Sequence, residues 1–246
     1  MIWNKLPQLI AEHDAIVNEF TAQCLAVTHS GEEFLLHPQR VMYWPAQHIL
    51  FAADVHVGKE HVFARHGIAI PGGISESTLQ RLFTLANNSG ARRLIVLGDF
   101  MHNVPSKREF WLGELTRLMD SHPDLDVEVV AGNHDRQAGR KLIDSRLTWH
   151  ASSLNVAKLA LHHEPCEDPQ AYVLCGHLHP AYQLRSSRRA GVRAPAFWFR
   201  KRYAVLPAFG EFTGGVIIKP DAKTDSVYMT DPECVMKVPV VKRSRS

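Results

Sequence analysis

The chain has 246 residues and a formal net charge of +3, which is too small to predict a nucleic-acid-binding protein by itself. Its apolar fraction is ordinary for a globular protein, so a chain of this length can bury a sizeable core. The four cysteines lie far apart without a Cys-x-x-Cys pair, which argues against a zinc ribbon or a disulfide framework and fits a reducing cytoplasm.

Membrane insertion and secretion are not expected from this sequence. No apolar run approaches membrane-spanning length. The first apolar segment contains Glu12, His13 and Asp14, so it does not resemble a signal peptide. We therefore expect a cytoplasmic protein that does not associate with a membrane.

We expect one domain over residues 1–246. Apolar residues at three- and four-residue spacing predict a helix over residues 1–22. This helix would either pack on its own domain or contact a partner, so a monomer and a homodimer are both compatible. The catalytic core would span residues 24–219, and residues 237–246 would form a basic, disordered tail.

Short apolar runs alternate with amphipathic segments along the core, which is typical of an α/β fold. The first two runs flank Ser30-Gly31 and predict a hairpin. We expect a loop after His56 and then a helix that Ser75 caps and Gly90 closes. A second helix is expected around residues 110–119. The predicted strands cover residues 24–27, 34–36, 41–44, 49–53, 94–97, 127–131, 154–161, 172–175, 205–210 and 214–218.

Polar side chains follow several of these strands at the point where each strand ends. Asp54 and His56 follow the apolar run 49–53, and residues two apart in a strand point to the same face. Open α/β sheets place their binding sites at such carboxyl ends. Gly98, Gly132 and Gly176 precede polar groups and would allow close backbone approach. The full set is Asp54, His56, Asp99, Asn133, His163 (or His162), His177 and His179.

These residue types predict a two-metal site. Two carboxylates, an amide and four imidazoles are too many ligands for one tetrahedral ion. They suit two octahedral ions that share a bridging carboxylate. Paired ions of this kind serve in-line displacement at phosphorus, so the sequence predicts phosphoester hydrolysis.

The motifs Asp-x-His, Gly-Asp, Gly-Asn-His-Asp and Gly-His-x-His, in this order between Asp54 and His179, resemble the calcineurin-like metallophosphoesterase superfamily. The resemblance implies a four-layer αββα sandwich with an N-terminal helix and hairpin, and a binuclear centre that often holds manganese. It implies two ligand groups bridged by Asp99. They are Asp54, His56 and His179 for one ion, and Asn133, His177 and the histidine of His162-His163 for the other.

The resemblance also assigns roles to residues that do not bind metal. His134 would hydrogen-bond phosphate or protonate the leaving oxygen, and Asp135 would orient it. His102 stands where many relatives have an aspartate, and it would face the substrate or cap a turn. We prefer His163 over His162 as the ligand, because strand alternation sends the two rings to opposite faces and Glu164-Pro165 resembles the turn after the ligand in close relatives.

A narrower resemblance extends from about Cys24 to Ile218. The hairpin before Asp54, the turn 70–73, and the stretches 176–180 and 206–215 resemble the ligase-associated DNA damage response endonuclease family PdeM. Membership would imply a manganese-dependent phosphodiesterase or DNA endonuclease in bacterial DNA repair. It would also imply association with a DNA ligase, an exonuclease and a helicase.

The stretch 185–202 holds seven basic residues and no acidic ones, with aromatic residues between them. Such a run can bind a nucleic-acid backbone and stack bases. Alternatively, residues 196–199 form a core strand beside an ordinary basic hairpin. The candidate contacts to phosphate are Lys59, Arg65, His102, Arg188 and Arg189. Two other functions stay open: hydrolysis of a small nucleotide or other small phosphoester, and a metal-bearing scaffold subunit of a repair complex.

Overall fold

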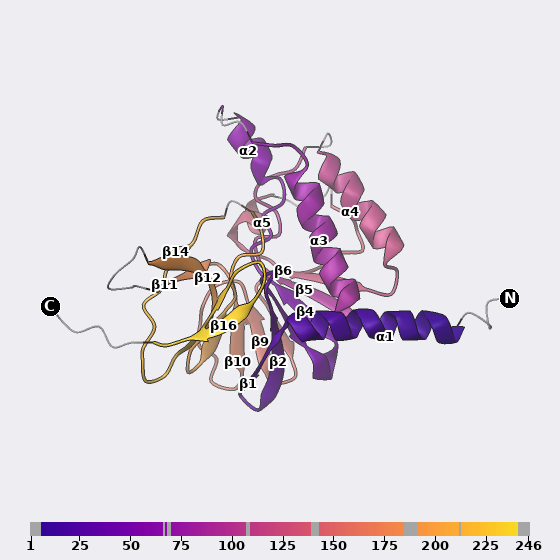
Figure 1. The fold of residues 1–246 in the computed structure, drawn as a ribbon. Helices are drawn as coiled ribbons and strands as arrows, with labels where there is room; N and C mark the ends of the chain where they lie inside the picture. The colour runs from indigo at the N-terminus through magenta and orange to yellow at the C-terminus, as the bar shows by residue number, and fades with distance from the viewer. Residues whose placement is uncertain are drawn as a thin grey trace.

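The computed structural model describes residues 6–65, 67, 70–106, 109–138, 143–184, 191–211 and 213–240. Two mixed β-sheets lie against each other, and helices cover the outer face of the first sheet (Figure 1). The predicted α/β sandwich is therefore confirmed, although no described helix contributes to the apolar cluster on the outer face of the second sheet, where the four-layer prediction expected one. Among the described residues no helix has the length and apolarity needed to cross a membrane.

The first sheet has seven strands in chain order. They are β1 (Leu25–His29), β2 (Glu32–His37), β3 (Val41–Trp44), β4 (Ile49–Ala52), β5 (Arg93–Leu97), β6 (Asp126–Val130) and β7 (Thr148–His150). The first four strands pair antiparallel, and β4 to β7 pair parallel. The parallel half brings the carboxyl ends of β4, β5 and β6 to one edge.

The second sheet has the order β14-β11-β12-β13-β10-β9-β8, with β15 paired to β12 and β16 paired to β15. Its strands are β8 (Ser153–Val156), β9 (Leu159–His162), β10 (Tyr172–Cys175), β11 (Pro180–Leu184), β12 (Val192–Phe199), β13 (Tyr203–Val205), β14 (Val216–Ile217), β15 (Ser226–Thr230) and β16 (Val235–Val238). Strands β9, β10 and β13 run parallel, so β9 and β10 also end side by side.

The helices are α1 (Leu6–Gln23), α2 (Lys59–Arg65), α3 (Ile74–Asn88), α4 (Phe110–Ser121) and α5 (Asn133–Ala138), with a 3₁₀ turn at Pro45–Gln47. Helices α3 and α4 pack against each other and on the first sheet, as Figure 1 shows. All these described helices precede β7. The apolar cluster on the outer face of the second sheet includes Ile218 and Val238, from the C-terminal part of the chain.

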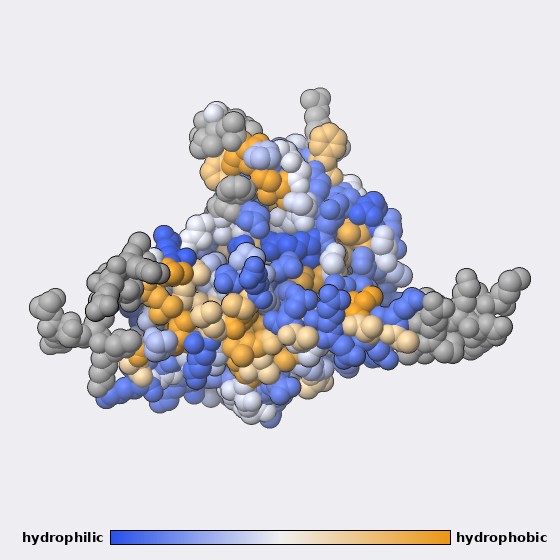
Figure 2. Space-filling view, in the orientation of Figure 1, coloured by the Kyte–Doolittle hydropathy of each residue, from blue (hydrophilic) through white to orange (hydrophobic). Residues whose placement is uncertain are grey.

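The central strands are buried on both faces, as their apolar runs predict. In β4, Leu50 belongs to the cluster under the helices, whereas Phe51 belongs to the cluster between the sheets. In β5, Val96 and Leu97 divide in the same way. The surface is mixed: in Figure 2 hydrophilic side chains cover much of the α3 side, and apolar groups gather near β16, where Met236 is 49% exposed.

Five local expectations were wrong. Of the strand expected at residues 205–210, only Val205 lies in a strand, β13. The segment after His56 is not a loop, because Lys59–Arg65 form α2. Helix α3 starts after Gly73, and the Ser75 side chain instead bonds Glu60 and the Gly58 amide. The apolar run 154–161 is two antiparallel strands, β8 and β9, around a turn at Ala157-Lys158. The tail expected from residue 237 starts later, because 237 and 238 belong to β16; residues 241–246 lie outside the described part.

Candidate metal centre

The polar residues predicted at the strand ends meet at one edge of the sandwich. Asp54 and His56 follow β4, and Asp99 follows β5. Asn133 and His134 open α5 immediately after β6. The second sheet contributes His163 after β9, and His177 and His179 between β10 and β11. Each sheet therefore supplies part of the cluster.

Two groups of carboxylate and imidazole side chains form here. In the first, His179 Nε2 lies 3.3 Å from Asp54 Oδ1 and 3.4 Å from His56 Nε2. In the second, His163 Nε2 lies 3.5 Å from Asp99 Oδ2 and 3.0 Å from His177 Nδ1. These two groups are the sets that the sequence predicts, apart from Asn133.

The donor atoms fit divalent ions. Ligands bonded at about 2.1 Å to one ion stand roughly 3–3.5 Å from each other, which matches the four separations given above. The Nδ1 atoms of His163 and His179 lie 3.2 and 3.1 Å from the carbonyl oxygens of Leu97 and Thr213. An Nδ1–H that donates to a carbonyl leaves the Nε2 lone pair directed into the group, which is the tautomer a metal ligand needs.

Asp99 links the two groups. Its Oδ2 atom lies 3.5 Å from His163 Nε2 and 4.0 Å from His56 Nε2. Its Oδ1 accepts a hydrogen bond from the His134 amide at 3.0 Å. The Asp54 carboxylate accepts one from the His177 amide at 2.9 Å. Backbone amides therefore fix both carboxylates, and Asp99 stands where a bridging ligand is expected.

The backbone turns sharply where it presents these side chains. Asp54, His56, Asp99, His177 and His179 all have φ between 45° and 68°. This left-handed region is uncommon for residues other than glycine, and such strain concentrates at functional sites.

Two glycines allow the strand ends to approach closely. A Cβ on Gly98 would lie 2.0 Å from His163 Nδ1, and a Cβ on Gly132 would lie 2.2 Å from Asp99 Oδ1. Any side chain at either position would displace a candidate ligand. The predicted close backbone approach is therefore confirmed at both.

Burial and neighbouring cations keep His56 neutral. Burial, followed by the nearby Lys59, His179, His102 and His134, lowers its pKa to about 2. Burial also lowers the pKa of Lys59, while Asp54 and Asp99 oppose that shift. Burial alone would lower the pKa of His179, but hydrogen bonding and attraction to Asp54 raise it overall.

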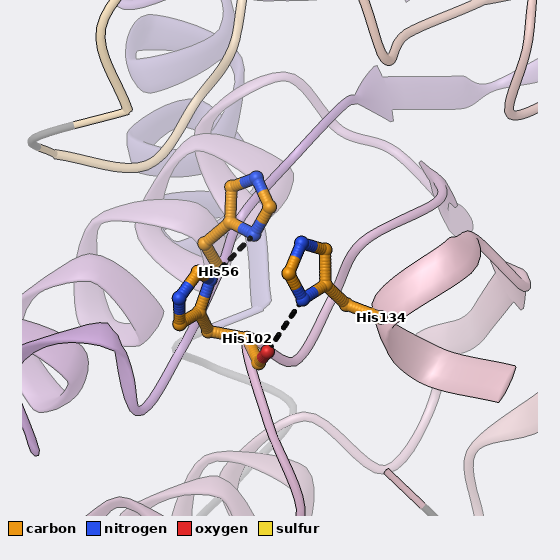
Figure 3. A group of neighbouring side chains, drawn as sticks. All are labelled: His56, His102 and His134. Atoms are coloured by element: carbon orange, nitrogen blue, oxygen red, sulfur yellow. Dashed lines mark hydrogen bonds between the residues drawn. The ribbon is translucent and has the colours of Figure 1, made fainter. Parts of the chain in front are cut away.

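His56, His102 and His134 form a third group, shown in Figure 3. The His134 Nδ1 atom lies 2.6 Å from the backbone carbonyl oxygen of His102, and the two rings stack with centroids 4.7 Å apart. His102 Nδ1 lies 3.5 Å from His56 Nδ1. This group contains no carboxylate, and His56 directs its Nε2 atom to the group of Asp54. His102 therefore faces the site rather than capping a turn.

The role expected of Asp135 is corrected by its contacts. Its carboxylate is 1% exposed and accepts hydrogen bonds from the amides of Phe100, Met101 and Gly132 at 3.2, 2.9 and 2.9 Å. Burial raises its pKa, and these amide bonds oppose the shift. Asp135 therefore fixes the loop after β5, and the carbonyl of His102 holds the His134 ring instead.

Comparisons with family models and with curated proteins give no match. Among solved structures, the chain is similar to the Pseudomonas putida nuclease MPE, with 32% sequence identity and a TM-score of 0.74 over 87% of this chain and 100% of that one. The chain belongs to the MPE nuclease family. A weaker similarity, at 19% identity and a TM-score of 0.36, is to the protein of unknown function AQ665 from Aquifex aeolicus, over 58% of this chain and 81% of that one.

In this member of the MPE family the amide of Asn133 has a protein partner. Its Oδ1 atom accepts a hydrogen bond from Arg136 Nη2, one turn further along α5. Arg136 also donates to the Ala131 carbonyl and lies 3.8 Å from Glu164. Sequence reasoning missed Arg136, although its three-residue spacing from Asn133 could have indicated the contact. Metal binding by Asn133 would require this hydrogen bond to open or to be shared.

The structure separates the two candidate histidines. His163 is 3% exposed and lies within the second group, whereas His162 ends β9 and pairs with Ser153 across the hairpin. The preferred assignment of His163 is thus supported by position. Strand alternation explains the difference, because neighbouring residues point to opposite faces.

The predicted phosphate contacts divide into two kinds. Lys59 is close enough to the centre to interact with both carboxylates, and His102 faces it. The side chain of Arg65, together with Arg188 and Arg189, lies outside the described residues. The alternative for residues 196–199 is confirmed, since they belong to β12 and the rings of Phe197 and Phe199 are buried. Those rings cannot stack on bases.

Proposed function

We propose that the protein is a metal-dependent phosphodiesterase that cuts DNA, within the calcineurin-like superfamily and its PdeM family. The observation that carries this proposal is the pair of carboxylate–imidazole groups joined through Asp99, in a chain that belongs to the family of the Pseudomonas putida nuclease MPE. A bacterial DNA repair setting, a cytoplasmic location and association with a DNA ligase, an exonuclease and a helicase are parts of the same proposal.

Two divalent ions, most readily Mn²⁺, would bind at the centre. Asp54, His56 and His179 would hold one, and Asn133, His163 and His177 the other, with Asp99 shared. When bound, such ions lower the pKa of a water molecule and neutralise charge on the phosphoryl oxygens. The carboxylates of Asp54 and Asp99 would compensate the positive charge of the two ions. The group of His56, His102 and His134 offers no such compensation, which argues against it as a metal site.

His134 would act on the leaving oxygen. When its Nδ1–H donates to the His102 carbonyl, at 2.6 Å, any second proton of the ring must reside on Nε2. That proton can be transferred to the oxygen that departs from phosphorus. The amide of His134 donates a hydrogen bond to Asp99 Oδ1, so the same residue that would supply the acid also fixes the bridging carboxylate. One backbone segment thus positions both metal ligand and acid.

The chain's basic groups would receive the substrate. Lys59 is half-buried, and the two carboxylates attract its charge. A lysine ammonium binds phosphate as a compact charge, so Lys59 would contact a non-bridging oxygen of the scissile group. His102, whose Nδ1 lies 3.5 Å from His56 Nδ1, would also contact the substrate. Arg65, Arg188 and Arg189 stay candidate contacts of the same kind.

The test is cleavage of circular single-stranded DNA and of a chromogenic phosphodiester, with Mn²⁺ and after chelation. Circular DNA has no ends, so any cut is endonucleolytic. We expect wild-type protein with Mn²⁺ to cut both substrates, and Asp99→Ala to cut neither. Cleavage of the small diester alone would favour a small-phosphoester hydrolase. No turnover of either substrate would favour a scaffold subunit.

A further inference from the structure

A groove with a volume of about 270 Å³ lies directly beside the candidate metal centre. Its wall includes His179, which also belongs to the group of Asp54. The rest of the wall comes from the turn after β2, from β11 and β12, and from the segment before β14. Figure 1 shows β11, β12 and β14 side by side. Among the described lining residues there are two cations, Arg40 and Arg193, and no acid.

Arg193 is held across the groove by its own sheet. It pairs with Gln183 where β12 runs antiparallel to β11, and its guanidinium donates to the Gly215 carbonyl. The next residue, Val216, donates its amide to the His179 carbonyl at 3.0 Å. Two hydrogen bonds, one from Arg193 to Gly215 and one from Val216 to His179, therefore connect Arg193 to the histidine of the metal centre. They hold the Arg193 side chain beside that histidine.

Arg40 is also fixed, and its charge is only partly compensated. Its Nη1 donates to the Ala208 carbonyl at 3.2 Å, and its Nη2 lies 3.7 Å from Glu211. The same glutamate oxygen lies 3.4 Å from Arg81, which stacks over the Phe209 ring. One half-exposed carboxylate thus serves two guanidinium groups, so with Arg193 this end of the molecule has a surplus of positive charge.

We infer that this groove binds the backbone phosphate next to the scissile phosphodiester of a DNA strand. Guanidinium groups match phosphate oxygens in geometry, and both arginines are held by carbonyls so that little rotamer freedom is lost on binding. His179 borders both the groove and the metal centre, so one strand can occupy both at once. This assignment rests on the proposed function and specifies its substrate as a polynucleotide strand rather than an isolated diester.

The test uses p-nitrophenyl esters of thymidine 5′- and 3′-monophosphate and their dinucleotide extensions, each of which adds one phosphodiester on a single side. With Mn²⁺, one of the two extensions should raise kcat/KM of the wild type by about tenfold, and added salt should reduce that gain. The extension that raises kcat/KM shows whether the groove binds the phosphate on the 5′ side or on the 3′ side of the scissile phosphodiester. Turnover of none of the esters would overturn the proposed function together with this inference.

The variants are Arg40→Gln and Arg193→Gln, with Arg193→Lys as the charge-retaining change and Arg117→Gln as the control. Arg117 lies on α4, paired with Glu114 and away from the groove. Each glutamine variant should lose the gain from the second phosphate, the lysine variant should keep part of it, and Arg117→Gln should keep all of it. If neither extension gains in the wild type, or if the gain survives in both glutamine variants, the groove does not bind phosphate.

Discussion

The Nδ1 atom of His134 lies 2.6 Å from the main-chain carbonyl oxygen of His102, and the two rings stack above each other. Because the contact comes from the backbone at position 102, it survives replacement of the side chain there. The ring of His134 is therefore held by the fold of the loop after β5, and Asp135 supports that loop through its bonds to the amides of Phe100 and Met101.

This arrangement predicts different effects for the two histidines. His134→Ala should lower kcat on a chromogenic diester by about 10²–10⁴-fold, which is the usual contribution of a general acid. His102→Ala should have a smaller effect, since the carbonyl that holds His134 is retained. Steady-state rates with Mn²⁺ test this. Equal losses in the two variants would mean that the His102 side chain itself takes part in proton transfer.

The two adjacent histidines at the end of β9 offer a matched pair for metal binding. His163→Ala should weaken binding of one of two Mn²⁺ ions by at least tenfold, because it removes a nitrogen 3.5 Å from Asp99 Oδ2. His162→Ala should bind metal like the wild type, since that residue lies outside the three candidate groups. Calorimetric titration of chelator-stripped protein measures both. Loss of metal in His162→Ala but not in His163→Ala would reverse the assignment.

Asp135→Asn should destabilise the protein even though the shape of the side chain is kept. The buried carboxylate accepts three amide hydrogen bonds, and an asparagine NH₂ group would face at least one of those amides. We expect a loss of about 3 kcal/mol in the free energy of unfolding by urea. Asp120→Asn, which removes an exposed partner of Arg146, should cost less than about 1 kcal/mol. Similar losses in the two variants would contradict the role given to Asp135.

His37 should make stability depend on pH. Its ring is 2% exposed and stacks on Phe20, and its Nδ1 accepts a hydrogen bond from the Gln39 amide. Burial lowers its pKa from 6.5 to about 4. Between these pH values the unfolded chain binds the proton more tightly than the folded one. The stability is therefore complete above pH 6.5 and falls as the pH drops toward 4.

The variant His37→Phe keeps the stacked ring but cannot be protonated. The difference in unfolding free energy between pH 7.5 and pH 4.5 should be smaller in this variant than in the wild type by about 2 kcal/mol. Urea titrations at the two pH values measure it. Other buried histidines also make stability depend on pH in both proteins. The quantity compared is therefore the change in unfolding free energy between the two pH values, in the wild type and in the variant. An identical change in the two proteins would show that His37 does not contribute to the pH dependence of stability.

Much of the centre could be predicted because it follows local rules. Parallel strands end at a common edge, and this rule placed the polar residues after β4, β5 and β6 together. Strand alternation also paired Asp54 with His56 in the prediction, although both residues lie beyond β4 with positive φ. Alternation within one strand also separated His163 from His162. These relationships depend on spacing alone, so they are visible in the sequence.

Contacts to backbone groups and between distant segments could not be predicted. The backbone amides that bind Asp135 carry no sequence signal. The prediction therefore paired Asp135 with the His134 ring rather than with those amides. Arg40 reaches the groove beside His179 only because the two sheets meet there. The turn at Ala157-Lys158 contains no glycine or proline, and the surrounding apolar residues concealed it within what looked like one strand.

The most direct measurement is a crystal structure of the protein grown with Mn²⁺, with anomalous scattering to locate the ions. We predict two anomalous peaks about 3.5–4 Å apart, one beside Asp54, His56 and His179 and one beside His163 and His177, with Asp99 between them. A single peak, or a peak enclosed by His56, His102 and His134 instead, would contradict the proposed two-metal centre.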